Sequence, residues 1–305
     1  MKIKKQVINR NRSNRIGSSG DKIFNIINTF ILITMGLICL LPFWYEICIS
    51  LSSNEAVLKK EVFLWPVKFS TEAYTYVLNR APFWRSLLIT CERVFLGLPL
   101  SLFLMILAAY PLSKNKLKFK FRSIYVWYFF ITMLFNGGMI PAYLVVVQMN
   151  LKNTIGALIL PGCVNVFNML LLLSFFRNVP EVLEDAARVD GASQWRILLK
   201  VYLPISLPVI ATVTLFTVVA NWNSWFDGMI YMKSDNYPLQ TYLRTIIFNF
   251  DFENMTLSDQ ITLAQMSQKS VKAAQMVLGS IPILAIYPFL QKYFISGITL
   301  GSVKE

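Results

Sequence analysis

Residues 184–204 read EDAARVDGASQWRILLKVYLP, and this charged segment separates two long apolar stretches of the chain. The residues before Gly191 favour a helix, and Gly191 is suited to end it, because glycine adopts the left-handed conformation without strain. Asn178 can cap the start of that helix. The pattern therefore predicts a helix of about three turns over residues 181–190, followed by an amphipathic stretch that leads to Pro204.

The composition of the whole chain indicates where such a segment belongs. Of 305 residues, 55% are hydrophobic, 15% are charged and none is histidine. A soluble domain with this much apolar surface would aggregate, so the composition predicts a membrane protein. A helix that spans the bilayer needs about 20 mostly apolar residues. Six stretches meet this requirement and predict an all-α membrane protein with six transmembrane helices: 24–48, 86–111, 121–147, 155–176, 204–225 and 273–290.

Basic residues are concentrated in two segments of the chain. Seven precede the first predicted span and five lie between the second and third, and these segments contain a single acid, Asp21. By the positive-inside rule both segments face the cytoplasm, and so do both termini and the helix between the fourth and fifth spans. The net charge of +13 is then a feature of topology. The lipid bilayer, and no nucleic acid, is the partner that it predicts.

The predicted organisation is one membrane domain with two tails. Residues 1–22 form a basic cytoplasmic tail, residues 23–296 form the six-helix domain, and residues 297–305 form a cytoplasmic C-terminal tail. The first span is too long for a signal peptide, whose apolar region has about 7 to 15 residues. Neither a catalytic site nor a metal site is predicted, because histidine is absent and the four cysteines lack metal-ligand spacing: Cys39, Cys48, Cys91 and Cys163.

Polar residues inside the predicted spans are candidates for a transport path. Asn136 precedes Gly137 and Gly138 in the third span, and a helix broken inside the bilayer needs polar groups or water to satisfy its backbone. Glycine is also simply more frequent in membrane helices, so the alternative stays open. Glu92 and Arg93 lie inside the second span. Because adjacent residues project to different sides, either one of them faces a polar cavity, or both extend to the interface by snorkelling.

Aromatic and acidic residues meet at the outer end of the fifth predicted span. Trp222, Trp225 and Asp227 could form a sugar-binding surface, since aromatic faces stack on sugar rings and carboxylates bind hydroxyl groups. An aromatic belt at the membrane interface predicts the same tryptophans. We therefore keep both interpretations.

The predicted cytoplasmic helix has the residues of a docking surface. Ala186 and Ala187 allow close approach of a partner, and Glu184 and Asp185 supply negative charge. Asp190 and the following glycine end the helix. An ordinary helical hairpin is the alternative, and alanine and charge alone do not distinguish the two.

The spacing in this segment resembles the loop of binding-protein-dependent ABC importer permeases. In that family an Ala-Ala pair is followed at fixed intervals by glycine, a β-branched residue, leucine and proline. The family usually has glutamate before the pair, where this chain has Asp185. The remainder of the chain, from about residue 22, is similar to carbohydrate-type permeases of the maltose-transporter kind, and especially to the polysaccharide and oligosaccharide subgroup. The matching segments are 108–113, 135–141, 222–225, 237–240, 287–294 and 297–304.

This resemblance implies a permease subunit that imports an oligosaccharide or a glycan fragment. It implies a heterodimer with a second permease, two ATPase subunits and an extracellular sugar-binding protein, and it makes residues 181–190 the coupling helix that docks on the ATPase. The chain has no Gly-x-x-x-x-Gly-Lys phosphate loop, so ATP and Mg²⁺ belong to the partner subunits, and the chain is not itself expected to be an enzyme or to hold a cofactor. An amino-acid or peptide importer and a gradient-driven transporter remain as alternatives.

Overall fold

The computed structural model describes residues 19–115, 119–248 and 268–302. These residues form helices and one isolated β-bridge, between Ser52 and Phe69. The predicted tails lie partly outside the described residues. The helices before the fourth predicted span are α2 (Ser19–Ser50), α3 (Asn54–Leu58), α4 (Glu72–Leu78), α5 (Ala81–Ser113), α6 (Arg122–Leu134) and α7 (Met139–Gln148).

The second half of the chain contains shorter helices that pack around α5. They are α8 (Ile155–Ile159), η1 (Leu160–Gly162), α9 (Val166–Arg177), α10 (Glu181–Val189), α11 (Gln194–Ile197), η2 (Leu198–Tyr202), α12 (Leu203–Ile205), α13 (Leu207–Asn223), α14 (Phe226–Tyr231), η3 (Ser234–Asn236) and α15 (Leu239–Phe248), and the long α17 (Gln268–Ser302) follows.

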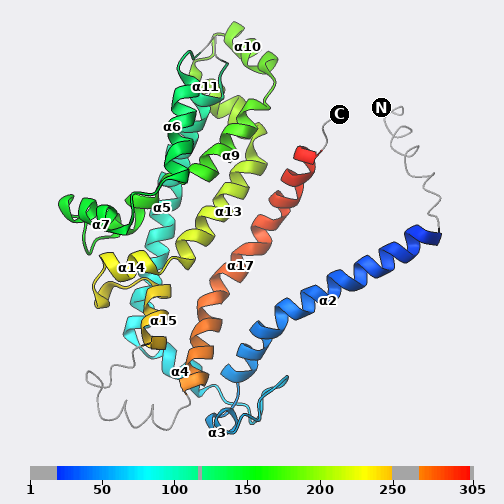
Figure 1. The fold of residues 1–305 in the computed structure, drawn as a ribbon, viewed down its shortest axis with the longest axis vertical. Coiled ribbons are helices and arrows are strands. Elements are labelled where there is room, and N and C mark those ends of the chain that lie inside the picture. Colours follow the sequence, from blue (N-terminus) through cyan, green and yellow to red (C-terminus); the bar gives the residue numbers. More distant parts are fainter. Residues whose placement is uncertain (1–18, 116–118, 249–267, 303–305) are drawn as a thin grey trace.

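Helix α5 is the central element of the bundle. It packs against α9 and α13, and α13 packs in turn against α17. At one end of the bundle, α10 and α11 cap a core formed by α5, α9 and α13. At the opposite end, α4 and α15 pack with α5, α13 and α17 in a second core (Figure 1). With 33 residues, α5 is about 50 Å long and connects the two ends.

Several predicted spans are bent where the sequence contains glycine or proline. Helices α6 and α7 meet at 111° across the segment that contains Gly138, whose φ is +90°. The fourth predicted span bends by 49° after η1, and the fifth bends by 82° near Ser206. Within the described residues, two helices are long and apolar enough to cross a membrane, or up to five if each bent pair is one span. The number six therefore stays a prediction.

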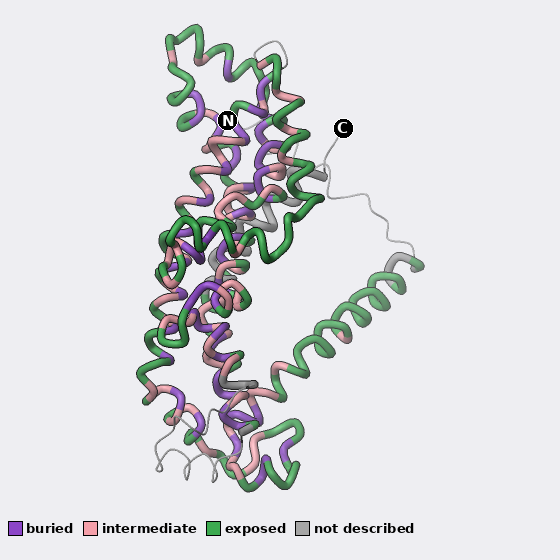
Figure 2. Tube along the Cα trace, turned by 60° about the vertical axis from the view of Figure 1, so that its left-hand side comes forward, coloured by how far each residue is buried: buried purple, intermediate pink, exposed green. Residues whose placement is uncertain are grey.

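Helix α2 stands apart from the bundle along most of its length. The most apolar 18-residue window within Ile23–Ser50 is 0% buried, and Figure 2 shows the helix as an almost entirely exposed arm. Only its last turns pack, with Cys48 and Ile49 buried in a cluster that includes Ala273 of α17. A long, exposed apolar helix suits a lipid environment or an apolar partner.

Candidate functional site

Helix α10 is the helix that the sequence predicted between the fourth and fifth spans. It ends at Val189, and Gly191 adopts a φ of +74°, as expected for a glycine that terminates a helix. The prediction that Asn178 caps this helix is wrong, because Asn178 instead closes α9. The N-cap position of α10 is Pro180, two residues after Asn178.

Glu184 of α10 lies inside the protein and not on its surface. It is 1% exposed. Its carboxylate accepts hydrogen bonds from Lys114 Nζ at 2.8 Å, Tyr202 Oη at 2.7 Å and Arg188 Nη2 at 2.8 Å. The Lys114 ammonium also lies 3.9 Å from the ring centroid of Tyr110 and 4.1 Å from that of Tyr202. We call these five residues the Glu184 cluster.

The Glu184 cluster keeps the buried carboxylate of Glu184 negatively charged. Burial alone raises the pKa of Glu184, but the hydrogen bonds from Lys114, Tyr202 and Arg188, together with the charge of Lys114, outweigh it and lower the pKa to about 2. Since Lys114 directly follows the last residue of α5, the cluster ties α10 to the central helix.

The outer surface of α10 remains open to a partner. Val182 is 76% exposed and Val189 is 88% exposed. Asp185, Ala186, Asp190 and Gly191 are also exposed, whereas Ala187 is half-buried against the core below. The two alanines of the predicted docking pair therefore face different environments. The exposed apolar side chains on a short, charged helix are typical of a protein-binding surface.

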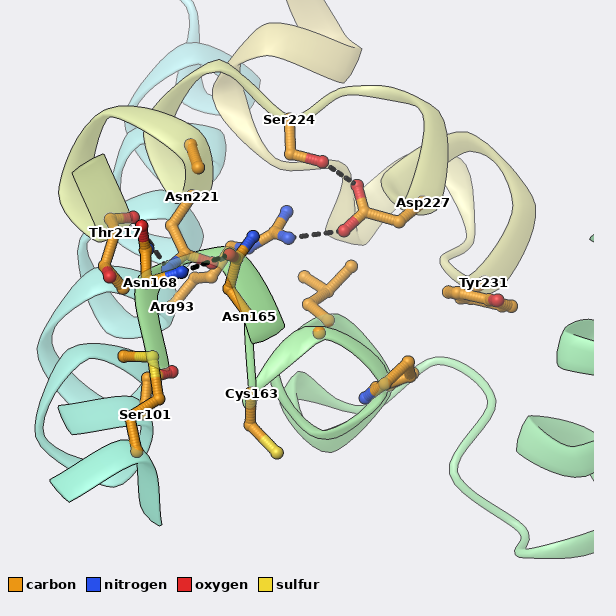
Figure 3. Close-up of a pocket in the computed structure, with 16 residues that line it drawn as sticks. Arg93, Ser101, Cys163, Asn165, Asn168, Thr217, Asn221, Ser224, Asp227 and Tyr231 are labelled. Atoms are coloured by element: carbon orange, nitrogen blue, oxygen red, sulfur yellow. Dashed lines mark hydrogen bonds and ion pairs between the residues drawn. The ribbon is translucent and has the colours of Figure 1, made fainter. Parts of the chain in front are cut away.

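A polar cavity of about 350 Å³ lies beside the middle part of α5. Its walls come from α5, α8, α9, α13 and α14 (Figure 3). We call it the Arg93 cavity. Its polar lining residues are Arg93, Ser101, Asn165, Asn168, Thr217, Asn221, Ser224 and Asp227.

Arg93 is 5% exposed and its guanidinium group lies inside this cavity. Its Nε donates to Asn221 Oδ1 at 3.1 Å, and its Nη2 forms an ion pair with Asp227 (Figure 3). Among the residues that the structure describes, Nη1 has no hydrogen-bond partner. Asp227 Oδ1 accepts further hydrogen bonds from Ser224 Oγ at 2.7 Å and Gly228 N at 2.9 Å. Arg93 therefore does not snorkel, and of the two adjacent charged residues it is Arg93 that faces a polar cavity.

The other predicted path residues are placed differently. Glu92 is exposed and does not line the Arg93 cavity. Asn136 is exposed too, and its Oδ1 accepts a hydrogen bond from Gly138 N at 2.9 Å, so it shapes the turn between α6 and α7.

The two tryptophans have separate environments. Trp222 is 4% exposed and donates from Nε1 to Gly279 O at 3.0 Å. Trp222 belongs neither to a membrane belt nor to a sugar-facing surface, because its side chain packs from α13 into the core that α17 shares. Trp225 is partly exposed and lines a second pocket of about 600 Å³, where the guanidinium of Arg244 lies 3.5 Å from its ring centroid.

Some residues of these sites were not found from the sequence. Lys114 counted only as one of several basic residues that set topology, and its contacts come from residues far along the chain. Asn165 and Asn168 were not singled out, although two amides within an apolar stretch were a usable signal.

Comparison with known proteins identifies the class of the chain. Residues 73–300 match the family described as binding-protein-dependent transport system inner membrane component. The chain belongs to this family. It is 37% identical to the polygalacturonan/rhamnogalacturonan transport system permease protein YtcP of Bacillus subtilis, over 93% of this chain and 99% of that protein. It is also 37% identical to Protein LplC of the same organism, over 93% of this chain and 95% of that protein.

Solved structures agree with this assignment. The fold matches a chain of a bacterial ABC transporter involved in the import of the acidic polysaccharide alginate, with a TM-score of 0.82, 34% identity and coverage of 91% of this chain and 98% of that chain. A second match, at 15% identity and a TM-score of 0.51, is a bacterial alginate ABC transporter in complex with alginate pentasaccharide-bound periplasmic protein, and it shows the fold alone. The family predicted from the spacing around Ala186 is thus confirmed, and this permease is a multi-pass inner membrane component.

Proposed function

We propose that this permease is a subunit of an ATP-driven importer for oligosaccharides or glycan fragments. The observation that carries the proposal is the 34% identity and TM-score of 0.82 to a chain of the alginate importer, over 91% of this permease. The YtcP match, which covers nearly the whole length of both chains, supports the same substrate class. In this proposal a second permease completes the path, an extracellular binding protein delivers the sugar, and two partner ATPase subunits bind ATP and Mg²⁺.

Helix α10 is the proposed coupling helix. Its exposed Val182, Ala186 and Val189 would enter a cleft of the ATPase, while Asp185 and Asp190 would contribute polar contacts at the edge. Glu184 would act on the inner side, where it anchors α10 to the end of α5. Movement of the ATPase pair would then reach the bundle through a buried ion pair instead of a flexible loop.

The Arg93 cavity is the proposed part of the translocation path. Along α5, Arg93 lies about 30 Å from the Glu184 cluster at 1.5 Å per residue. One continuous helix therefore links the proposed docking end to the cavity. The proposed topology has six spans, with α10 and both termini on the cytoplasmic side.

Substitutions on α10 test the coupling proposal. We expect Ala186→Glu to abolish sugar uptake, because it places a charged side chain on the exposed docking surface. Gly191→Asp should do the same, because it adds a charge beside the docking surface at a φ of +74°, which residues with a side chain rarely adopt. Ala187→Glu is a less selective test, since Ala187 also packs against the core. The measurements are uptake in cells and the amount of ATPase that co-purifies with the tagged permease.

Ala81→Glu is the matched control, because Ala81 is an exposed alanine at the opposite end of the bundle. It should retain uptake and ATPase association. Normal uptake with Ala186→Glu and Gly191→Asp would contradict the assignment of α10. Uptake that follows a proton or sodium gradient, with no associated ATP hydrolysis, would instead indicate a secondary transporter.

A further inference from the structure

The Arg93 cavity contains a cationic group with unused hydrogen-bonding capacity. Arg93 is buried and two of its three nitrogens are occupied, by Asn221 and Asp227. Nη1 is buried and has no partner in the described part of the chain. A buried donor on a charged group is costly to leave unpaired, so such a donor is expected to find an acceptor from a ligand or water.

Asp227, the acidic residue in the cavity, does not occupy the unused donor of Arg93. Each carboxylate oxygen of Asp227 is already engaged, Oδ1 by Ser224 and Gly228 and Oδ2 by Arg93. Its hydrogen-bonding positions are therefore largely occupied, whereas Nη1 of Arg93 still lacks an acceptor among the described residues. Asn165 and Asn168 add amide groups to the lining of the cavity. The volume of about 350 Å³ is within the range of small-ligand sites.

We propose that Arg93 binds the carboxylate of a uronic-acid unit, and that this contact makes the permease selective for acidic oligosaccharides over neutral ones. The inference rests on the proposed function and specifies its substrate class. A hydrogen bond from a guanidinium to a carboxylate is roughly twice as strong as one between neutral groups. A neutral sugar can offer Nη1 only a hydroxyl oxygen, so it forms the weaker bond.

The experiment measures binding to the complete importer complex in lipid nanodiscs, without the binding protein, because that protein has a selectivity of its own. The probes are oligogalacturonate and the same oligosaccharide after chemical reduction of its carboxyl groups to alcohols. The reported quantity is the ratio of the two affinities. We expect the wild-type complex to favour the acidic probe by about tenfold, which corresponds to the stronger bond.

Three variants separate charge from structure. Asp227→Asn leaves Arg93 without a counter-charge and should increase the ratio. Arg93→Gln combined with Asp227→Asn keeps hydrogen-bonding groups in both positions but removes the cation, and it should lower the ratio to about one. Arg85→Gln is the matched control: Arg85 lies on the same helix but is exposed and binds Asn236 outside the cavity. It should leave the ratio unchanged.

The outcomes distinguish this inference from the proposed function. A wild-type complex that binds both probes equally, or a folded double variant that retains the wild-type ratio, would overturn the role of Arg93 and leave the permease a sugar importer. A wild-type complex that binds neither probe and shows no ATPase stimulation by any sugar-loaded binding protein would overturn the proposed function itself. The melting temperature of each variant shows whether the complex is folded.

Discussion

Two ion pairs, Lys114–Glu184 and Arg93–Asp227, connect α5 to helices that lie far away in the sequence. They differ in how many of their buried polar atoms have hydrogen-bond partners. In the Glu184 cluster, both carboxylate oxygens have donors, and Lys114 is enclosed by two aromatic rings. In the Arg93 cavity, Nη1 has no partner among the residues that the structure describes, and the pair borders a polar space. A closed network favours one rigid arrangement, whereas an open one retains capacity for a ligand. In our proposal, the closed network at the end of α5 is a mechanical link and the open one within α5 is a recognition site.

The largest effect is expected when the closed network is opened. Lys114→Met removes the cation that donates to the buried Glu184 carboxylate. Breaking a buried ion pair typically costs about 3 to 5 kcal/mol, so the melting temperature should fall strongly. The measurement is thermal unfolding of the purified permease complex. Lys59→Met is the control, because the Lys59–Glu55 pair is exposed and should contribute little.

A Lys114→Met variant as stable as the wild type would contradict the claim that the Glu184 cluster rigidly ties α10 to the bundle. The double variant Lys114→Met with Glu184→Met sharpens the test further. It replaces both charges with apolar groups of similar length, so it should recover much of the stability that the single variant loses.

Acid should weaken the closed network selectively. The pKa of Glu184 is about 2 in the folded protein and 4.5 ordinarily. A lowered pKa means that its stabilising contribution is complete above about pH 4.5 and is lost as the pH falls toward about 2. Unfolding experiments over this pH range should show a steeper loss of stability for the wild type than for Glu184→Gln. Equal slopes would show that the carboxylate is not the group responsible.

A smaller effect is expected at the open site. Asp227→Asn keeps the shape of the side chain but weakens its bond to Arg93, and bonds to charged groups contribute about 1.5 to 3 kcal/mol. Because the cavity is polar and water can replace part of this bond, we expect a loss near 1.5 kcal/mol, measured by thermal unfolding. A loss as large as that of Lys114→Met would mean that the cavity pair is mainly structural.

The smallest effect separates the two tryptophans. Trp222→Phe keeps most of the packing and loses the hydrogen bond to Gly279, so about 1 kcal/mol of stability should be lost with no change in sugar preference. Trp225→Phe is the matched variant on the second pocket. A changed preference with Trp222→Phe would restore the sugar-binding interpretation of that residue.

Features that depend on short stretches of sequence were largely predictable. Gly191 ends α10, and the glycines after Asn136 break the third predicted span, because backbone preference is local. The spaced pattern around Ala186 predicted the family, since the intervals between residues can be counted in the sequence without the fold. Asn178 shows the limit of the same reasoning. Asparagine is a good N-capping residue, yet α9 continues to Arg177, so Asn178 is the C-cap of α9 and not the N-cap of α10.

By itself, the sequence determined that the chain is a helical membrane permease with a charged helix between two apolar stretches. Only the tertiary structure decided that Glu184 faces inward, that Arg93 and not Glu92 enters the cavity, and that Trp222 is buried. The physical reason is that composition and spacing record what a residue can do, whereas its partner is set by helices that approach from elsewhere in the chain. Lys114 and Glu184, or Arg93 and Asp227, become pairs only when the bundle forms.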